Sequence, residues 1–125
     1  MIGTASGPIN VLMVDDSKAD RRLVAEALKV WGRPACFAWE TDGREALHNL
    51  RIAARTGRTL PDLILLDLHM PAMHGSAVLA LLKSSPALNH IPVVIFSTSF
   101  DADERENACH LGARSFIRKP LELDT

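Results

Sequence analysis

Residues 61–71 read PDLILLDLHMP, and this stretch decides the fold. Four apolar residues, 63–66, follow one another between two aspartates with no polar position among them. A short apolar run of this kind is typical of a strand that is covered on both faces, as in a parallel sheet. The carboxylate of Asp67 is then predicted to lie at the C-terminal end of a buried strand, where open α/β sheets bind their ligands.

Four further apolar runs flank this strand and alternate with segments of helical spacing. The runs are residues 9–14, 35–39, 93–96 and 115–117. The helical segments are residues 17–31, a segment that Asp42 can cap and that ends near Gly57, and residues 76–83 and 101–111. Strands that alternate with helices predict βαβ units with right-handed crossovers. The predicted fold class is therefore α/β, with a doubly wound parallel sheet of five strands.

The apolar side chains of the first predicted helix fall on one face, which we expect to pack on the sheet. They are Leu23, Val24, Ala27, Leu28 and Trp31. Trp39 is expected to take part in packing as well. Cys36 and Cys109 have no CxxC or metal-type spacing, which favours buried, reduced thiols over a disulfide.

Composition limits the size and the class of the protein. A chain of 125 residues supports one compact domain, and 47% hydrophobic residues with a net charge of −1 exclude a disordered chain. Because 14 basic and 15 acidic residues are interspersed, nucleic acid and membrane surfaces are not expected partners. The apolar runs are too short for a membrane span, and residues 1–10 carry no secretion signal. We expect a cytoplasmic protein with a loose leader at residues 1–8 and one domain at residues 9–125.

Polar or charged side chains follow four of the five predicted strands. Asp15 and Asp16 follow the first, Asp67 the third, Ser97 the fourth and Lys119 the last. Since the carboxyl ends of parallel strands meet at one edge of a sheet, the three carboxylates are expected to cluster and to require a cation. Oxygen ligands with room for water suit Mg²⁺.

Four motifs in this order resemble the receiver domain of bacterial two-component response regulators. They are VDDS at 14–17, LLDLHMP at 65–71 followed by Gly75, VVIFSTS at 93–99 and FIRKP at 116–120. The resemblance covers residues 9–121 and implies a flavodoxin-like receiver fold. Finer features are similar to single-domain regulators associated with bacterial phytochromes, namely DSKADR at 16–21, the long 51–61 connection and IPVV at 91–94.

The resemblance implies a function and a set of site residues. Asp67 is expected to accept a phosphoryl group from a sensor histidine kinase, with a bacterial phytochrome as the kinase that the finer similarity suggests. Asp16, Asp67 and the backbone carbonyl of His69 are expected to ligate Mg²⁺, while Asp15 acts mostly through water. Ser97 and Lys119 are expected to contact phosphoryl oxygens, and the Lys119–Pro120 peptide to be cis.

The same resemblance implies a switch, in which Ser97 moves toward the phosphoryl group and Phe116 takes the vacated space. It also implies self-phosphorylation and slow hydrolysis, so whether the protein counts as an enzyme stays open. For the His69 side chain two interpretations stay open: it shapes access to Asp67, or it is solvent-exposed and contributes its carbonyl alone. His48, His74, His90 and His110 lack mutual ligand spacing and are expected at the surface.

Two alternative functions remain. An Asp-nucleophile phosphohydrolase of the haloacid dehalogenase type needs a second Asp two residues after the nucleophile, where this chain has His69. A degenerate receiver would act as a protein-binding module without phosphate, although its acid, hydroxyl and lysine set is intact here.

Five residues follow Pro120, too few for the fifth helix with which receivers normally close. We therefore expect that helix to be missing and one face of the sheet beside residues 17–31 to be uncovered. A homodimer through that face is one expectation, and a chain shortened at its end is the alternative.

Overall fold

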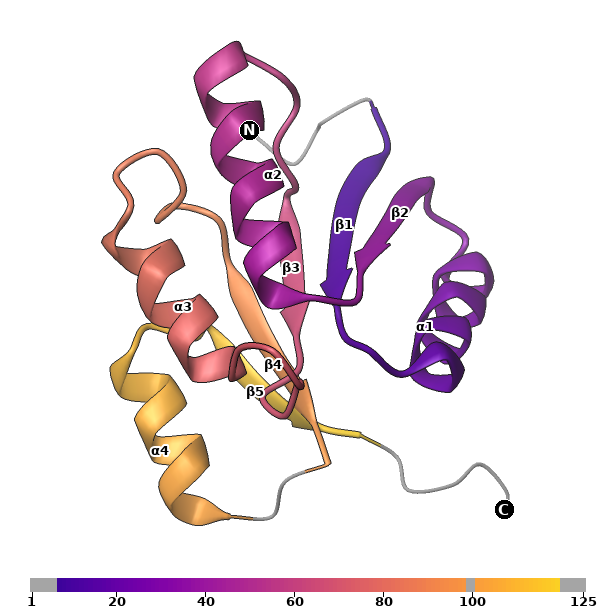
Figure 1. Ribbon diagram of the computed structural model, residues 1–125. Helices are drawn as coiled ribbons and strands as arrows, with labels where there is room; N and C mark the ends of the chain where they lie inside the picture. The colour runs from indigo at the N-terminus through magenta and orange to yellow at the C-terminus, as the bar shows by residue number, and fades with distance from the viewer. Residues whose placement is uncertain (1–6, 99–100, 120–125) are drawn as a thin grey trace, which may run out of the picture.

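The computed structural model describes residues 7–98 and 101–119, which form one sheet and its covering helices (Figure 1). In chain order the elements are β1 (Ile9–Val14), α1 (Lys18–Trp31), β2 (Ala35–Glu40), α2 (Gly43–Thr56), β3 (Leu63–Leu66), α3 (Gly75–Ser84), β4 (Val93–Ser97), α4 (Ala102–His110) and β5 (Ser115–Arg118). Each strand begins where its apolar run predicts and ends within one residue of the predicted position.

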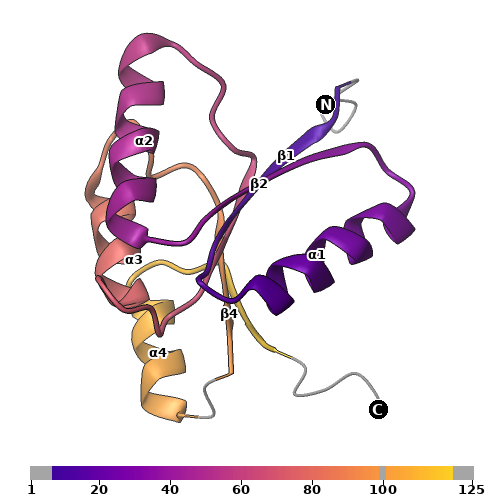
Figure 2. The same cartoon turned by 45° about the vertical axis from the view of Figure 1, so that its right-hand side comes forward.

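All five strands are parallel, in the order β2-β1-β3-β4-β5. The chain order reverses between β1 and β3, which is the switch point at which such sheets bind ligands. Figure 2 shows α2, α3 and α4 on one face of the sheet and α1 on the other. The predicted doubly wound five-stranded sheet is confirmed.

Local signals set the helix ends. Ser17 caps α1 by accepting a hydrogen bond from the backbone N–H of Asp20, and Asp42 caps α2 in the same way through Arg44. Gly32 and Gly57 end these helices with φ of 83° and 74°, in the left-handed region that glycine enters without a steric cost.

The hydrophobic core lies mainly between the sheet and the helices α2 and α3. It contains fully buried side chains of β3 and β4, such as Ile64, Leu66 and Ile95, against Leu79 and Leu82 of α3. This packing makes β3 and β4 rigid, so the loops at their C-terminal ends have fixed starting points.

The face that carries α1 differs from the prediction. No residue of α1 is buried: Leu23, Val24 and Leu28 are half-buried, and Ala27 and Trp31 are exposed. Among the described residues α1 is the one helix on that face (Figure 2). Its apolar side chains therefore stay partly or fully exposed. The predicted inward position of Ala27 and Trp31 is therefore wrong.

The predicted burial of both cysteines is also wrong. Cys36 and Cys109 are free thiols, and both are exposed. Cys36 lies on β2, one of the two edge strands, and Cys109 lies in the last turn of α4. Trp39 on the same edge strand is 46% exposed and packs its ring under the Arg21 guanidinium, 3.9 Å from the ring centre.

Several predictions fall outside the described residues. These are most of the leader at residues 1–8, the Lys119–Pro120 peptide and the missing fifth helix. Among the described residues, no helix combines the length and the apolar character that crossing a membrane requires.

Candidate functional site

Three carboxylates meet at the C-terminal edge of the sheet. Val14 of β1 is paired with Leu66 of β3, so the aspartates that follow these residues are neighbours. One carboxylate oxygen from each of Asp15, Asp16 and Asp67 lies within 4.8 Å of the others. Asp15 and Asp67 are 2% and 6% exposed, whereas Asp16 is exposed. The predicted clustering of the three acids is confirmed.

Lys119 supplies positive charge to this cluster from the end of β5. Its side chain is 5% exposed, and its ammonium lies 2.8 Å from Asp15 Oδ2 and 3.9 Å from Asp67 Oδ1. Its backbone N–H donates to the carbonyl of Ser97, which fixes the end of β5 against β4. Burial alone would lower the pKa of Lys119, but hydrogen bonds from its ammonium to carboxylates outweigh that effect and raise the pKa. The side chain is therefore a buried cation.

A fourth carboxylate, Asp20, belongs to this cluster, and the sequence reasoning missed it as a site residue. Asp20 Oδ2 lies 2.6 Å from the Lys119 ammonium, closer than any other acid. In the sequence Asp20 reads as an acid in the first turn of a helix. The available signal was its position in the first turn of the helix that begins directly after Asp15 and Asp16, at the C-terminal edge of the sheet.

The charged forms of Asp15 and Asp67 are disfavoured by burial and by repulsion between neighbouring carboxylates. Burial raises the pKa of Asp67 to about 6, and the nearby charge of Asp15 adds to the rise, while Lys119 and the backbone N–H of His69 offset part of it. Burial also raises the pKa of Asp15, and its hydrogen bond with Lys119 counteracts that. One ammonium thus stands against four carboxylates, and the site has a surplus of negative charge.

A hard divalent cation fits this donor set. The ligand atoms that the three clustered aspartates offer are all oxygens, and the exposed side of Asp16 leaves room for water. Mg²⁺ is bound in this manner, by one or two carboxylates together with several waters. The backbone N–H of Ser17 donates to Asp15 Oδ1 at 2.8 Å, which orients that carboxylate within the cluster.

The two predicted switch residues lie on neighbouring strands. Ser97 ends β4 at the same edge as Asp67 and is fully buried. Phe116 is paired with Ile95 in the sheet, is half-buried and packs against the core. The Arg105 guanidinium of α4 lies 5.4 Å from the centre of its ring. Both residues therefore adjoin the site, one at the strand end and one beneath α4.

The remaining predicted residues are the histidines. His48, His90 and His110 are exposed, as predicted. The His69 side chain is also exposed, and its Nε2 lies 3.0 Å from Glu104 of α4. His74 is exposed too, but it lies beside His69, a proximity that the spacing of the two residues did not indicate.

The chain is similar to known proteins over nearly its whole length. The family model of the response regulator receiver domain matches residues 11–125. The response regulator Rcp1 of Synechocystis sp. is 36% identical over 124 residues, which cover 98% of this chain and 84% of Rcp1. The probable methanogenesis regulatory protein FilR2 of Methanothrix harundinacea is 36% identical over 96% of this chain and 77% of its own length.

Solved structures agree with these similarities. The Mn²⁺-bound form of Rcp1 superimposes with a TM-score of 0.85 at 37% identity, over 93% of this chain and 84% of the other. The phosphorylated cyanobacterial phytochrome response regulator RcpA gives 0.86 at 39% identity, over 94% and 84%. The resemblance to phytochrome-associated regulators is thereby confirmed. With four clustered acids, a buried lysine and a family match over residues 11–125, the chain belongs to the response regulator receiver domains.

Proposed function

We propose that this receiver accepts a phosphoryl group on Asp67 from a phosphohistidine of a sensor kinase and relays the change to a partner protein. One observation carries the proposal. The Asp67 carboxylate stands at the sheet's switch point, 3.9 Å from a buried ammonium and beside two further carboxylates that suit a divalent cation. We further propose that residues 9–125 form the receiver domain and that it works in the cytoplasm, where ATP-dependent kinases load their histidines.

The chemistry follows from the positions of these groups. An Asp67 oxygen attacks the phosphorus, a P–O bond forms, the P–N bond to the kinase imidazole breaks, and the imidazole takes up a proton. Phosphoryl transfer asks the protein mainly for alignment and charge neutralisation. Asp16, Asp67 and the His69 carbonyl would hold Mg²⁺, with Asp15 acting through water. The ion supplies charge neutralisation at the phosphoryl oxygens.

Lys119 and Ser97 complete the proposed site. The Lys119 ammonium binds a second phosphoryl oxygen, and its position 3.9 Å from Asp67 Oδ1 supports that role. The Ser97 hydroxyl donates to a third. Attack of water on the same phosphorus then returns the Asp67 carboxylate and inorganic phosphate, so slow self-dephosphorylation belongs to the proposal, as does phosphorylation by small donors such as acetyl phosphate.

Labelling tests the acceptor residue. Radiolabelled acetyl phosphate or a phosphorylated kinase should label the wild type and should not label Asp67→Asn. Asp103→Asn, which alters an exposed aspartate at the start of α4, is the control and should label normally. Label retained by Asp67→Asn would refute the assignment, and an unlabelled wild type would favour the protein-binding module that does not use phosphate.

Metal dependence is tested separately. Phosphorylation should stop in EDTA, and Asp16→Asn should abolish Mg²⁺ binding in a calorimetric titration. Wild-type rates without any divalent ion would contradict the proposed Mg²⁺ role.

A bacterial phytochrome is the proposed kinase, and the similarity to the phytochrome response regulator RcpA supports it. Initial transfer rates from a phytochrome kinase and from unrelated histidine kinases should differ in favour of the phytochrome. Equal transfer rates would contradict the proposal that a phytochrome is the kinase.

The proposed relay uses Ser97 and Phe116. Because the two residues lie on adjacent strands, a shift of Ser97 toward the phosphoryl group opens space toward which Phe116 can turn. Ser97→Ala should leave Asp67 phosphorylated but weaken the response. An unchanged NMR environment of Phe116 on addition of beryllofluoride, a phosphoryl mimic, would exclude the switch.

A homodimer is the second part of the partner proposal. Val30 is 84% exposed, and Trp31 and Ile117 are each about half exposed, so α1 and β5 both present apolar side chains to solvent. Light scattering at micromolar concentration should give the mass of two chains. A monomer that binds no apolar dye would contradict this arrangement.

A further inference from the structure

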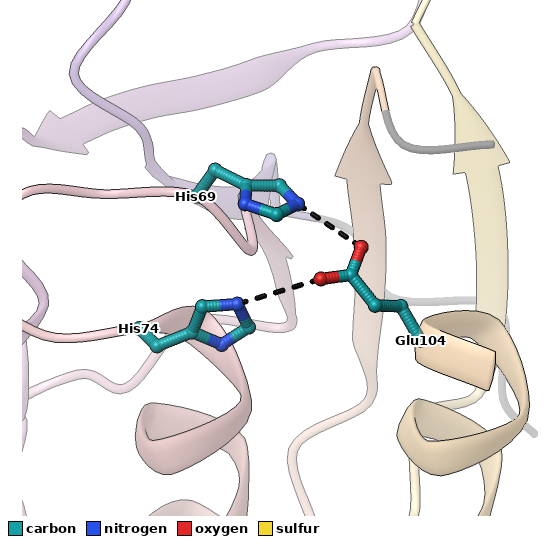
Figure 3. Close-up of side chains that lie close together, drawn as sticks. All are labelled: His69, His74 and Glu104. Atoms are coloured by element: carbon teal, nitrogen blue, oxygen red, sulfur yellow. Dashed lines mark hydrogen bonds and ion pairs between the residues drawn. The ribbon is translucent and has the colours of Figure 1, made fainter. Parts of the chain in front are cut away.

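His69, His74 and Glu104 form a second cluster of metal-binding side chains, separate from the acidic one (Figure 3). They come from three places: His69 from the loop after β3, His74 from the N-cap of α3 and Glu104 from α4. His69 Nε2 lies 3.0 Å from Glu104 Oε1, and His74 Nε2 lies 3.8 Å from Glu104 Oε2. The cluster joins segments that are 35 residues apart in the sequence.

The spacing of these atoms suits a transition-metal ion. One ligand atom from each side chain lies within 4.8 Å of the others. A tetrahedral Zn²⁺ with bonds of about 2.0–2.2 Å separates its ligand atoms by about 3.3 Å, so rotations of these side chains close the site. The imidazole rings stand edge to face, with their centres 5.2 Å apart, and both direct Nε2 toward the carboxylate.

A neighbouring hydroxyl already orients one of the imidazoles. His74 Nδ1 accepts a hydrogen bond from the backbone N–H of Ser76 at 3.1 Å and lies 2.8 Å from Ser76 Oγ, and these contacts hold the ring with Nε2 toward Glu104. Metal binding at Nε2 would move the ring proton to Nδ1, where Ser76 Oγ is in position to accept it. Such partners fix the orientation of metal-bound histidines. His69 and His74 are about half exposed, which gives an ion access and leaves a position for water.

We propose that His69, His74 and Glu104 bind a borderline divalent ion, Zn²⁺, distinct from the Mg²⁺ of the acidic site. Two imidazole nitrogens and one carboxylate match Zn²⁺, whereas Mg²⁺ prefers oxygen ligands alone. Bound Zn²⁺ cross-links the loop that carries Asp67 to α4 and restrains their relative movement. The site does not depend on phosphorylation.

Calorimetric titration of the tag-free protein with Zn²⁺, in excess Mg²⁺, tests the site. We expect one ion per chain, and affinity weaker by about ten-fold or more in Glu104→Gln and in His74→Gln. His110→Gln, in the last turn of α4, and Asp16→Asn, in the acidic site, are controls that should bind as the wild type does. Absence of Zn²⁺ binding, or binding that Asp16→Asn removes and Glu104→Gln spares, would overturn the proposal.

Two further measurements report on geometry and on the cross-link. Co²⁺ in place of Zn²⁺ should give the intense visible absorption of a tetrahedral site in the wild type and lose it in Glu104→Gln. Amide hydrogen exchange in α4 should slow on Zn²⁺ addition to the wild type and stay unchanged in Glu104→Gln. Co²⁺ spectra or exchange rates that are the same in both proteins would contradict the proposal.

Discussion

At the scale of single residues, the site is defined by its charge imbalance. Lys119 is the one cation whose ion pairs reach Asp15, Asp20 and Asp67 among the described residues, and it cannot neutralise all three. Burial strengthens the repulsion that remains, because the low local dielectric screens charges poorly. The metal-free protein therefore carries an electrostatic cost that a bound cation or a neutral substitution can relieve.

Asp67→Asn is expected to stabilise the metal-free protein at pH 7. The rise of the Asp67 pKa from 3.8 to about 6 corresponds to about 3 kcal/mol, since one pH unit is worth about 1.4 kcal/mol. The folded state holds the proton more tightly than the unfolded state, so wild-type stability falls as the pH rises from 4 through 6. In urea unfolding with EDTA, the wild type and Asp67→Asn should have equal free energies of unfolding near pH 4. By pH 7 the free energy of unfolding of Asp67→Asn should be the larger. A stability difference that does not change with pH would contradict the ionisation of Asp67 as its cause.

Lys119→Met, in contrast to Asp67→Asn, should destabilise the protein. It keeps the volume of the side chain but leaves the buried Asp15 carboxylate without its cation, at a cost of about 3 kcal/mol at pH 7. Because protonated Asp15 needs no partner, the loss should shrink toward pH 4. The measurement is the same urea series, and Lys29→Met, at an exposed ion pair of α1, is the control that should change little.

At the scale of elements, the loop between β3 and α3 aims Asp67. Gly75 begins α3 directly against the strand end, and its N–H donates to the Leu68 carbonyl at 2.7 Å. A Cβ at position 75 would lie 2.2 Å from the Asp67 carbonyl oxygen. Glycine is thus required at position 75 because backbone atoms approach closely there, and not because of its φ angle.

Gly75→Ala should therefore displace Asp67 and destabilise the fold by about 1–3 kcal/mol, the usual range for overpacking. Phosphorylation by acetyl phosphate should slow as well, because the carboxylate leaves its position beside Lys119. Gly7→Ala adds a Cβ that meets nothing within 4 Å and is the matched control. Normal stability and labelling in Gly75→Ala would show that the loop tolerates the shift.

The two faces of the sheet should differ in their response to truncation. Leu79 of α3 is fully buried, whereas Leu28 of α1 is half-buried. Leu79→Ala should cost about 2–5 kcal/mol and Leu28→Ala about 1 kcal/mol, because less apolar surface leaves water at α1. Urea unfolding measures both. Equal losses would mean that something covers α1 in solution, and the Leu28→Ala loss would then depend on protein concentration if a second chain is the cover.

At the scale of the whole molecule, cation binding and folding are coupled. The acidic cluster joins the residues that follow β1 and β3 with Asp20 of α1, and they come together only in the folded chain. The proposed Mg²⁺ should therefore bind the folded state and stabilise it. At a concentration one hundred times its Kd the gain is about 2.7 kcal/mol. Thermal unfolding should shift upward with Mg²⁺ in the wild type and should shift much less in Asp16→Asn. An equal shift in both proteins would place the ion elsewhere.

The sequence by itself determined the sheet, the order of its elements and the residues at its C-terminal edge. These features depend on local properties, namely apolar runs, helix caps and the residue that follows each strand, and the parallel topology then brings Asp15, Asp67 and Lys119 to one edge. Exposure is different, because it depends on which elements cover a residue, and this is why Trp31 and Cys36 were expected inside and lie outside.

Only the tertiary structure decided which side chains meet across elements. Asp20 reaches Lys119, and Glu104 reaches His69 and His74, because the sheet order places β5 and α4 beside segments that are distant in sequence. No spacing along the chain encodes a contact between a loop after β3 and a helix after β4. Such contacts arise from the packing of the folded chain, and the proposed second metal site rests on them.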